Sequence, residues 1–488
     1  MMKLLLSFSF SVALSVMMMA QGQIVSAELV SSATQQQLSA SYPIFNFLTD
    51  VDAYSVTYTS VDVHGDPDTL SGLVVIPLDS TYIYPRIAYM HGTVTDRWAV
   101  PSQMSGEGGI TMAFSGMGSV AVAPDYPGLG TGRGFHPYVH AESQARSGID
   151  LLRAASELAS NLGVLINDGL LMAGYSQGGH GALGLHKEIE EKYAAEFTVD
   201  ASAPMSGPYS LSDIMLQNTL DSNVYFFPSY LVNITVGMQT AYGTIYDSLE
   251  QIFESAFIAD IEQFISEEIS LTDLNEVLIS KLIQQEGASI PLFIFKESFR
   301  QEIINDPENN PLIIALKDND LVDWAPQAPT RLYYCIGDDQ VPYQNSLVAE
   351  AGLIAAGGTN VQAIESGGII FDHGACATPA FFGASNHLLF HQELGMVSSL
   401  ISQFSKPEKL AVFPNPVFDI LNMADLEELE TFQSYRVLTP DGRVLIQQPL
   451  NGRRSFDLSQ LQDGFYIIML LDENLQRTKR ATFIKVSN

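Results

Sequence analysis

Apolar positions follow two different periods along the body of the chain. Short apolar runs, such as 87–90 and 170–173, are typical of buried strands, whereas 149–158 repeats its apolar residues at helical spacing. Alternation of such strands and helices predicts a mostly parallel α/β sheet with helices on both faces. Residues 56–63 and 72–76 predict an antiparallel hairpin in front of that sheet.

The strand predicted at 170–173 runs into a glycine-rich turn. The turn reads Gly174-Tyr175-Ser176-Gln177-Gly178, and a helical pattern follows it through about Glu191. G-x-S-x-G between a strand and a helix is typical of a nucleophile elbow, a strained turn that lifts the serine hydroxyl above the sheet. The alternative is a turn with a serine in solvent. The flanking strand and helix favour Ser176 as a nucleophile.

Two carboxylates and a histidine follow later strands in the order that accompanies such an elbow. The strand predicted at 331–336 ends at Asp338 and Asp339. The D-x-x-V-P spacing favours Asp338 as the orienting acid, with Asp339 as the alternative, and one of the two is expected to cap the next helix. A strand at 360–364 follows, and His373 in the loop after it is predicted to be the general base.

Two backbone N–H groups are expected to stabilise the oxyanion of a tetrahedral intermediate. Gln177 directly follows the nucleophile and supplies the first. The loop after the third strand reads His91-Gly92-Thr93, and Thr93 is the candidate for the second, with His91 as scaffold. Asp125, in a tight loop after the fourth strand, is interpreted as structural.

The sequence predicts no metal ion and no organic cofactor. His387 and His391 share a predicted helix at i, i+4 spacing, but the glutamate of an H-E-x-x-H zinc motif is missing. Two cysteines cannot form a multi-thiolate zinc site. The histidine pair is therefore interpreted as core or surface side chains.

A long insertion separates the strand predicted at 199–203 from the one at 331–336. Residues 245–282 are acidic and show helical apolar spacing, which predicts a helical cap at about 210–325. Most of its aromatic stripe is expected to pack on the sheet. The cap is a candidate lid, in which Tyr225-Phe226-Phe227 and Tyr230 would line an acyl pocket.

The N-terminal residues predict a secretory signal peptide at 1–20. Lys3 is followed by an apolar run that ends at Ala20 and is shorter than the ~20 residues of a membrane span. Cleavage is expected after Ala20 or Ala27, and the alternative is a membrane anchor. The mature protein is expected to be exported.

Charge divides the chain near Lys406-Pro407. The whole chain holds 23 Lys and Arg against 55 Asp and Glu, a net charge of −32, which disfavours binding to nucleic acid. Residues 407–488 hold 9 against 11 and are nearly neutral. Short β-type runs alternate there with turn signals, which predicts a separate β-sandwich of ~80 residues at 407–488.

The body of the chain resembles the α/β-hydrolase superfamily and, within it, the secretory lipase/esterase family. The matching pieces are His91-Gly92-Thr93, Asp125-Tyr126-Pro127-Gly128-Leu129-Gly130, Gly174-Tyr175-Ser176-Gln177-Gly178-Gly179 and Val341-Pro342-Tyr343. The resemblance covers roughly residues 40–405 and implies a hydrolase domain at 38–405 with Ser176, Asp338 and His373 as its triad. Gly337 directly before the aspartate departs from the family's longer gap, which keeps Asp339 as an alternative.

The tail resembles the C-terminal sorting domain of the type IX secretion system of Bacteroidetes-like bacteria. The matching pieces are Val412-Phe413-Pro414-Asn415-Pro416-Val417, Gly442-Arg443-Val444, Leu461-Gln462-Asp463-Gly464-Phe465-Tyr466 and Phe483-Ile484-Lys485-Val486. This resemblance implies contact with the secretion machinery, passage through the periplasm and outer membrane, and cleavage of the tail or attachment at the cell surface. The alternative is a carbohydrate-binding or adhesive sandwich.

The two cysteines flank the candidate acid and base. Cys335 precedes Asp338 on one strand, and Cys376 follows His373 after the next. Adjacent strand ends in an exported protein favour a disulfide that braces both loops, and the alternative is two buried free thiols.

Together these observations predict an exported serine carboxylester hydrolase of the esterase/lipase type, acting on a small-molecule or lipid ester. Two alternatives remain open. The first is a serine peptidase of the prolyl-oligopeptidase type, although no β-propeller is predicted before the hydrolase domain. The second is a surface-displayed protein with a hydrolase fold that binds without catalysis.

Overall fold

The computed structural model describes residues 21–221, 223–396, 408–424, 429–439, 444–472 and 478–486. The predicted signal peptide and the boundary expected at Lys406-Pro407 lie outside these residues. By its internal contacts the chain forms two compact units. One comprises the described residues up to Glu393 except Asp79–Ile83, and the other comprises Asp79–Ile83 and the described residues from Leu394 onward.

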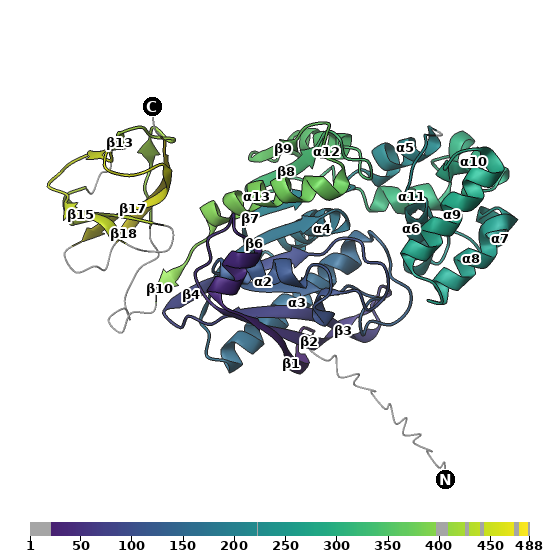
Figure 1. Ribbon diagram of the computed structural model, residues 1–488, viewed down its shortest axis with the longest axis horizontal. Coiled ribbons are helices and arrows are strands. Elements are labelled where there is room, and N and C mark those ends of the chain that lie inside the picture. The colour runs from purple at the N-terminus through teal and green to yellow at the C-terminus, as the bar shows by residue number, and fades with distance from the viewer. Residues whose placement is uncertain are drawn as a thin grey trace, which may run out of the picture. The chain divides into compact units, whose positions relative to one another are not determined.

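A largely parallel sheet forms the centre of the first unit (Figure 1). Its strands lie in the order β1 (Ile24–Ala33), β2 (Val51–Val61), β3 (Pro67–Pro77), β5 (Val120–Pro124), β4 (Tyr82–Met90), β6 (Ile166–Tyr175), β7 (Thr198–Met205), β8 (Thr330–Cys335) and β9 (Val361–Gly367). Neighbours from β5 to β9 run parallel, and β1, β2 and β3 pair antiparallel. The predicted parallel sheet and its leading hairpin are confirmed.

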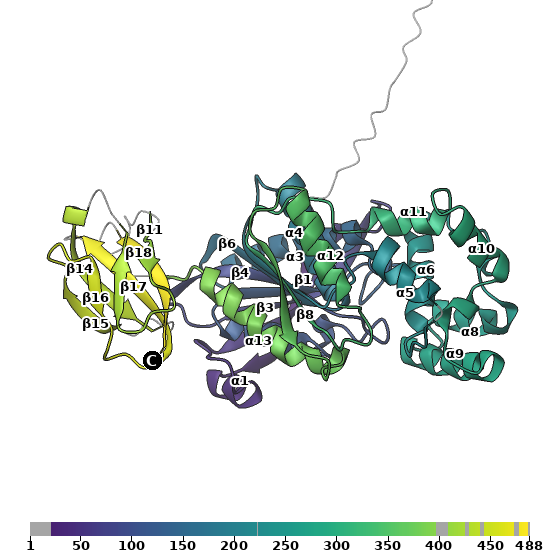
Figure 2. The same cartoon turned by 90° about the horizontal axis from the view of Figure 1, so that it is seen from above.

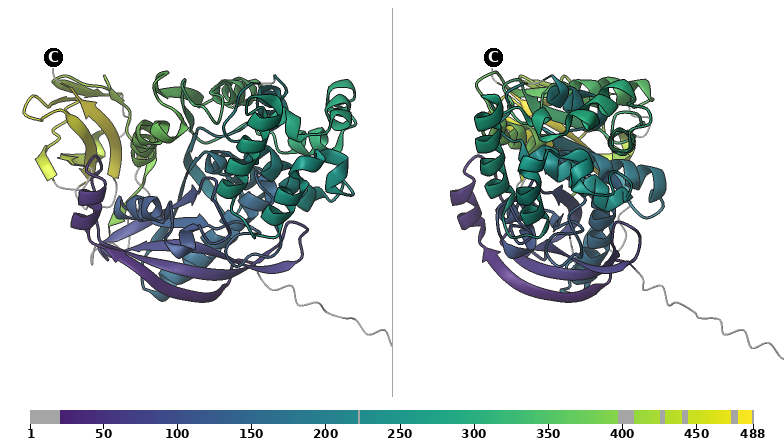
Figure 3. Two further views of the ribbon diagram at one scale, coloured as in Figure 1. Left: turned by 45° about the vertical axis from the view of Figure 1, so that its right-hand side comes forward. Right: turned by 90° about the vertical axis from the view of Figure 1, so that its right-hand side faces the viewer.

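β1 is an element that the hydrophobic pattern does not predict. Most of its side chains are exposed, so it lacks the alternation of buried and exposed positions that marks a strand. Its backbone nevertheless pairs with β2, for example Ala27 with Val56. The sheet thus begins upstream of residue 38, where the hydrolase domain was expected to start, and the purple strands of Figure 3 show this edge.

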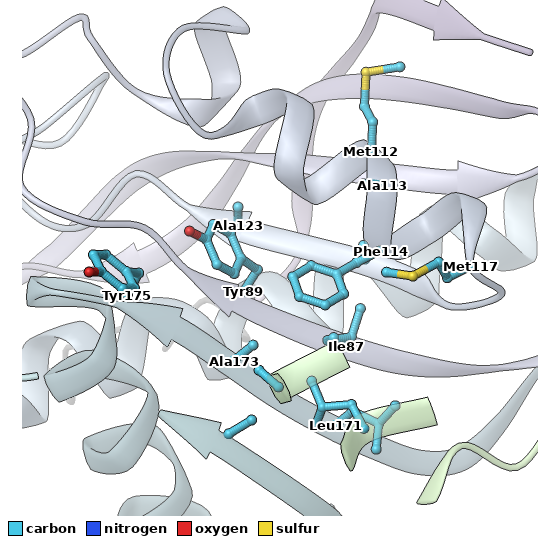
Figure 4. Close-up of a cluster of buried hydrophobic side chains, with 14 of the residues drawn as sticks. Ile87, Tyr89, Met112, Ala113, Phe114, Met117, Ala123, Leu171, Ala173 and Tyr175 are labelled. Atoms are coloured by element: carbon cyan, nitrogen blue, oxygen red, sulfur yellow. The ribbon is translucent and has the colours of Figure 1, made fainter. Parts of the chain in front are cut away.

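Helices cover both faces of the sheet (Figure 2). On one face lie α1 (Gln35–Ser41), α2 (Gly108–Gly116) and α13 (His373–His391). They bury a large apolar cluster with strand residues such as Tyr89 and Leu171 (Figure 4). The other face carries α3 (Ala141–Asn161), α4 (Gln177–Lys192) and α12 (Gln344–Ala355). Because the strands are parallel, the ends of β4, β6, β8 and β9 meet at one edge of the sheet, where such folds carry their sites.

The predicted cap consists of short helices between β7 and β8. These are α5 (Leu216–Leu220), α6 (Ser229–Tyr242), α7 (Leu249–Ile252), α8 (Ser255–Ile265), α9 (Leu271–Glu286), α10 (Glu297–Asn305) and α11 (Pro311–Asp318). Their apolar side chains form a core of their own around Phe253, Phe257 and Leu278. The expectation that the aromatic stripe packs mainly on the sheet is therefore wrong, because the cap is large enough to bury that stripe among its own helices.

The second unit contains two small sheets over a shared apolar cluster. Its strand β10 (Gly395–Met396) pairs with Tyr82 and Ile83. Among the described residues, one sheet has the order β11 (Glu408–Lys409), β18 (Thr478–Lys485), β17 (Gly464–Asp472), β14 (Phe432–Leu438) and β15 (Val444–Pro449). The other has the order β12 (Val412–Phe413), β13 (Ile420–Met423) and β16 (Ser455–Asp457). Both sheets contribute to one buried cluster, so the predicted small β domain is confirmed.

Candidate active site

Ser176 lies in a sharp turn between β6 and α4. Its φ of 59° and ψ of −124° are unusual for a residue with a side chain. Two glycines permit the turn. A Cβ on Gly178 would lie 1.9 Å from the backbone oxygen of Met90, and one on Gly174 would lie 2.0 Å from that of Gly178. The local sequence thus forms the strained strand–turn–helix geometry of a nucleophile elbow.

Asp338 contacts the imidazole ring of His373. Nδ1 of His373 lies 2.8 Å from Oδ2 and 2.9 Å from Oδ1 of Asp338. Oδ1 also accepts backbone N–H groups from Gln340 and Val341, at 3.0 and 2.9 Å, which fix the carboxylate. With Nδ1 donating to the carboxylate, Nε2 is left as the nitrogen that can accept a proton.

Asp339, the alternative acid, contacts the backbone of His373 instead of its ring. Its Oδ1 accepts the His373 N–H at 3.1 Å. No side-chain bond caps α12, so the expectation that one of the two carboxylates caps this helix is wrong. Asp338 thus contacts the imidazole ring of His373, and Asp339 contacts its main chain.

His373 is the first residue of α13. The sequence-based prediction that it lies in a loop is therefore wrong. Asp372 caps this helix by accepting the N–H of Ala375 at 2.8 Å, which is why the helix begins directly at the histidine. The ring of Tyr175 lies 5.0 Å from that of His373, and its hydroxyl donates to the His373 carbonyl. The histidine is therefore held beside the residue that precedes Ser176.

Ser176 Oγ and His373 Nε2 are not joined by a hydrogen bond among the described contacts. Catalytic hydrogen bonds are often long without substrate and tighten when it binds.

Two backbone N–H groups near Ser176 have no hydrogen-bond partner within the described part of the chain, those of Thr93 and Gln177. The side chains of both residues are anchored by hydrogen bonds to neighbouring residues. Thr93 Oγ1 lies 2.7 Å from the Tyr138 hydroxyl, and Gln177 Nε2 lies 2.7 Å from Nε2 of His136. Unpaired N–H groups on anchored residues are what an oxyanion hole requires.

His136 is held as a neutral ring. Burial lowers the pKa of His136 to about 3. Its Nδ1 donates to the Pro127 carbonyl at 2.8 Å, so its Nε2 accepts from the side-chain amide of Gln177. The histidine thereby orients the residue that follows the nucleophile, a contact that no sequence motif marks.

Asp125 and His91 form a scaffold behind the site. The buried Asp125 accepts the Ser71 hydroxyl at 2.6 Å and the Ser102 N–H at 3.0 Å. His91 stacks on Tyr126 with 4.1 Å between ring centroids, and burial lowers the pKa of His91 to about 4. Both residues hold loops together, in line with the structural role expected from the sequence.

A disulfide joins the two elements that carry the candidate acid and base. Cys335 at the end of β8 is bonded to Cys376 in the first turn of α13, with 5.8 Å between their Cα atoms. Each cysteine lies three residues from Asp338 or His373 in the sequence. The alternative of two free thiols is thus not observed.

His387 and His391 lie side by side on α13, with ring centroids 4.9 Å apart. Nε2 of His387 contacts the Pro329 carbonyl at 3.3 Å, and burial lowers the pKa of His387 to about 3. Within the described ranges, no group of three or more His, Cys, Asp or Glu side chains could hold a metal ion. The geometry of the pair is that of partly buried packing residues.

A cavity of about 370 Å³ opens beside the two unpaired N–H groups. Thr93, Gln177, His136 and Tyr138 line it on the side of the sheet, and the cap contributes Asn233, Phe264, Ile269, Ser270 and Leu271. Arg97 pairs with Glu267, and the Leu271 N–H donates to the Thr95 carbonyl at 2.8 Å, so the cap turn is tied to the Thr93 loop. No motif in the sequence predicts this cavity, because it forms only where a cap turn meets a distant loop.

The predicted acyl pocket at Tyr225-Phe226-Phe227 and Tyr230 is not part of this cavity. The hydroxyls of Tyr225 and Tyr230 bond the backbone and side chain of Gln340, both at 3.0 Å, next to Asp338. Phe226 is 59% exposed. Tyr225 and Tyr230 therefore support the loop of the candidate acid, and the acyl pocket expected at these four residues stays a prediction.

Among the described residues, we find no helix with the length and apolar character needed to cross a membrane. Residues 411–485 match the family model of the secretion system C-terminal sorting domain. No curated protein sequence matches the chain.

Solved structures similar to the chain include esterases and lipases. The rice cell wall degrading esterase LipA from Xanthomonas oryzae is 28% identical, with a TM-score of 0.66, over 76% of this chain and 97% of that one. A putative hydrolase from Legionella pneumophila is 26% identical, with a TM-score of 0.65 and the same coverage. Candida antarctica lipase A, at 15% identity and a TM-score of 0.54 over 73% of this chain and 78% of that one, shares the fold.

These similarities support a hydrolase of the esterase/lipase type for the first unit. The sorting domain indicates type IX secretion and hence a secreted or cell-surface protein of Bacteroidetes. The first unit thus has the α/β-hydrolase fold, and the chain carries a type IX sorting domain at its C-terminus.

Proposed function

We propose that the protein is an exported serine carboxylester hydrolase. Ser176 Oγ attacks the ester carbonyl while His373 Nε2 takes its proton, and Asp338 stabilises the resulting imidazolium. The tetrahedral intermediate collapses when His373 returns the proton to the leaving alcohol. Water then attacks the acyl-enzyme by the same route, which releases the acid and restores the serine.

The observation that carries this proposal is the shared placement of the three groups. A strained serine, a buried histidine with its Nδ1 bound to a carboxylate, and two unpaired N–H groups lie at one edge of the sheet. Each group has a defined task in acyl transfer. Similarity to esterases and lipases supports the same reaction class.

The cavity beside the oxyanion donors supports an ester with at least one bulky group. It is lined both by apolar side chains, such as Phe135 and Leu129, and by polar ones, such as Asn233 and Thr95. A small-molecule or lipid ester suits such a lining better than a folded protein. The N-terminal signal peptide and the tail would then deliver the enzyme to esters outside the cell.

A panel of p-nitrophenyl esters from acetyl to palmitoyl, on wild type beside Ser176→Ala, tests the proposal. We expect turnover by wild type and at least a 10³-fold loss in the variant. The chain-length optimum would separate a short-chain esterase from a lipase. A folded wild type that hydrolyses none of the esters but cleaves a matching peptide amide would favour the peptidase alternative. If it also fails to react with a fluorophosphonate at Ser176, a non-catalytic binding protein would be favoured.

A further inference from the structure

Glu107 lies beneath the loop that carries the Thr93 N–H. It directly precedes α2, and its Oε2 accepts the Gly92 N–H at 2.8 Å and the Tyr89 hydroxyl at 2.6 Å. Tyr89 is completely buried between Phe114 and Tyr175 in the apolar cluster of Figure 4. A rigid part of the core therefore holds the carboxyl group against the loop.

Both peptide groups next to Gly92 are held by side chains. Glu107 accepts the N–H on one side, and Nδ1 of His91 lies 2.7 Å from the Gly92 carbonyl on the other. In a planar trans peptide the carbonyl and the following N–H point in opposite directions, so fixing the Gly92 carbonyl also directs the Thr93 N–H. The two contacts limit both backbone rotations of a residue that would otherwise be the most mobile in the loop.

Gly92 lies close both to the carboxyl group of Glu107 and to Ser176. A Cβ on Gly92 would lie 3.0 Å from Oε1 of Glu107 and 3.8 Å from Cβ of Ser176. Burial raises the pKa of Glu107, and its bonds to Tyr89 and Gly92 oppose that rise. A buried carboxyl group is costly unless its contacts compensate for the lost hydration.

We propose that Glu107 is a positioning residue for the oxyanion hole, which fixes the Gly92 turn so that the Thr93 N–H points at the developing oxyanion. This inference rests on the proposed function. Glu107 acts through the backbone and does not touch the substrate. This role requires only an oxygen that accepts hydrogen bonds. An uncharged side chain of the same shape should therefore be able to take the place of Glu107.

The test compares Glu107→Ala with Glu107→Gln on p-nitrophenyl butyrate. Removing the acceptor frees Gly92 and should lower kcat by about 10- to 100-fold with little change in KM, because the Thr93 contact forms in the transition state. A boronic acid, which mimics the tetrahedral intermediate, should bind more weakly by a similar factor. The glutamine carbonyl can accept both hydrogen bonds, so Glu107→Gln should retain kcat within about threefold of wild type.

Glu190 provides the matched control. Its carboxylate also accepts backbone N–H groups, from Gln327 at 2.7 Å and Ala328 at 2.9 Å, but far along the chain from the Thr93 loop. Glu190→Ala should lower the melting temperature and leave kcat unchanged. A purely structural role of Glu107 would make Glu107→Ala behave in the same way, and that result would overturn the inference.

Tyr89→Phe keeps the test decisive if Glu107→Ala does not fold. It removes one of the two bonds to Oε2 while retaining the ring that packs in the core, and we expect a three- to tenfold loss of kcat at unchanged KM. An unchanged kcat in Tyr89→Phe would then overturn the inference. A wild type without ester turnover would instead overturn the proposed function and this inference together.

Discussion

At the scale of single residues, the two adjacent aspartates make separable contacts with His373. Asp338 bonds the ring and Asp339 bonds the backbone N–H. Asp338→Asn should lower kcat by about 10⁴, because an amide cannot hold Nδ1–H in the required tautomer. Asp339→Asn keeps an oxygen that can accept the backbone N–H, so we expect less than a tenfold loss. Steady-state kinetics on p-nitrophenyl butyrate distinguishes the two.

The reverse ranking of these variants would identify Asp339 as the acid. The sequence alone could not separate the pair, since neighbouring residues on a loop share nearly every local signal. The choice depends on which carboxylate reaches the imidazole ring of His373, and that is a property of the packed structure. Glu107 was missed for a similar reason, because its bond to Gly92 joins two loops without any motif.

His136 predicts a pH dependence of stability. Its folded pKa of about 3 lies well below its usual value of 6.5, mainly through burial, with His91 and Arg97 lowering it further. The unfolded chain therefore binds more protons between these values, and the free energy of unfolding must fall as the pH drops through that window. For His136 alone the loss between pH 7.5 and pH 5 is about 2 kcal/mol.

Urea unfolding of wild type and His136→Gln at pH 7.5 and pH 5 measures this contribution. The variant should be less stable at pH 7.5, because it loses its bond to Pro127, but its stability should fall less on acidification, by about 2 kcal/mol. His64→Gln is the control, since His64 is exposed. An equal pH dependence in wild type and His136→Gln would contradict a buried neutral His136.

At the scale of elements, the disulfide ties β8 to α13 and so couples the two loops of the candidate acid and base. It closes a loop of 41 residues. A loop of this length corresponds to about 4 kcal/mol of stabilisation in the chain-entropy model. The double variant Cys335→Ala/Cys376→Ala should lose about that much free energy of unfolding, measured by urea denaturation. We also expect a lower kcat, because Asp338 and His373 lose their shared brace.

A double variant with full kcat but lower stability would show that packing alone aligns the pair. Full stability would instead indicate that the unfolded chain is already constrained without the bridge.

The sequence could predict those elements whose buried positions recur at the spacing of a strand or of a helix. The strands β4 to β8 and the helices α3 and α4 are buried on both or one face, and their apolar residues recur accordingly. β1 was missed because backbone pairing, with little burial, holds it in place. The cavity was missed because the cap turn at 267–271 and the loop at 93–98 meet only through tertiary contacts.

At the scale of the whole molecule, the path of export should decide where the mature chain begins. The sequence left two cleavage sites open, after Ala20 and after Ala27. β1 starts at Ile24, and its residues Ile24, Ser26 and Ala27 pair with β2. Cleavage after Ala27 would remove these pairings and expose the edge of β2, whereas cleavage after Ala20 keeps the strand whole.

We therefore expect the secreted protein to begin at Gln21. Mass spectrometry of N-terminal peptides from the culture medium of the native host, or from its cell surface, measures this directly, and the same spectra show whether residues 411–485 remain attached. A second experiment gives the physical reason. A version that begins at Glu28 should unfold at a lower urea concentration than one that begins at Gln21. It lacks four of the ten residues of β1, so Val56 and Tyr58 lose their neighbours on that edge. A secreted chain that begins at Glu28 with undiminished stability would show that β1 is dispensable and that the hydrolase unit begins further along the chain.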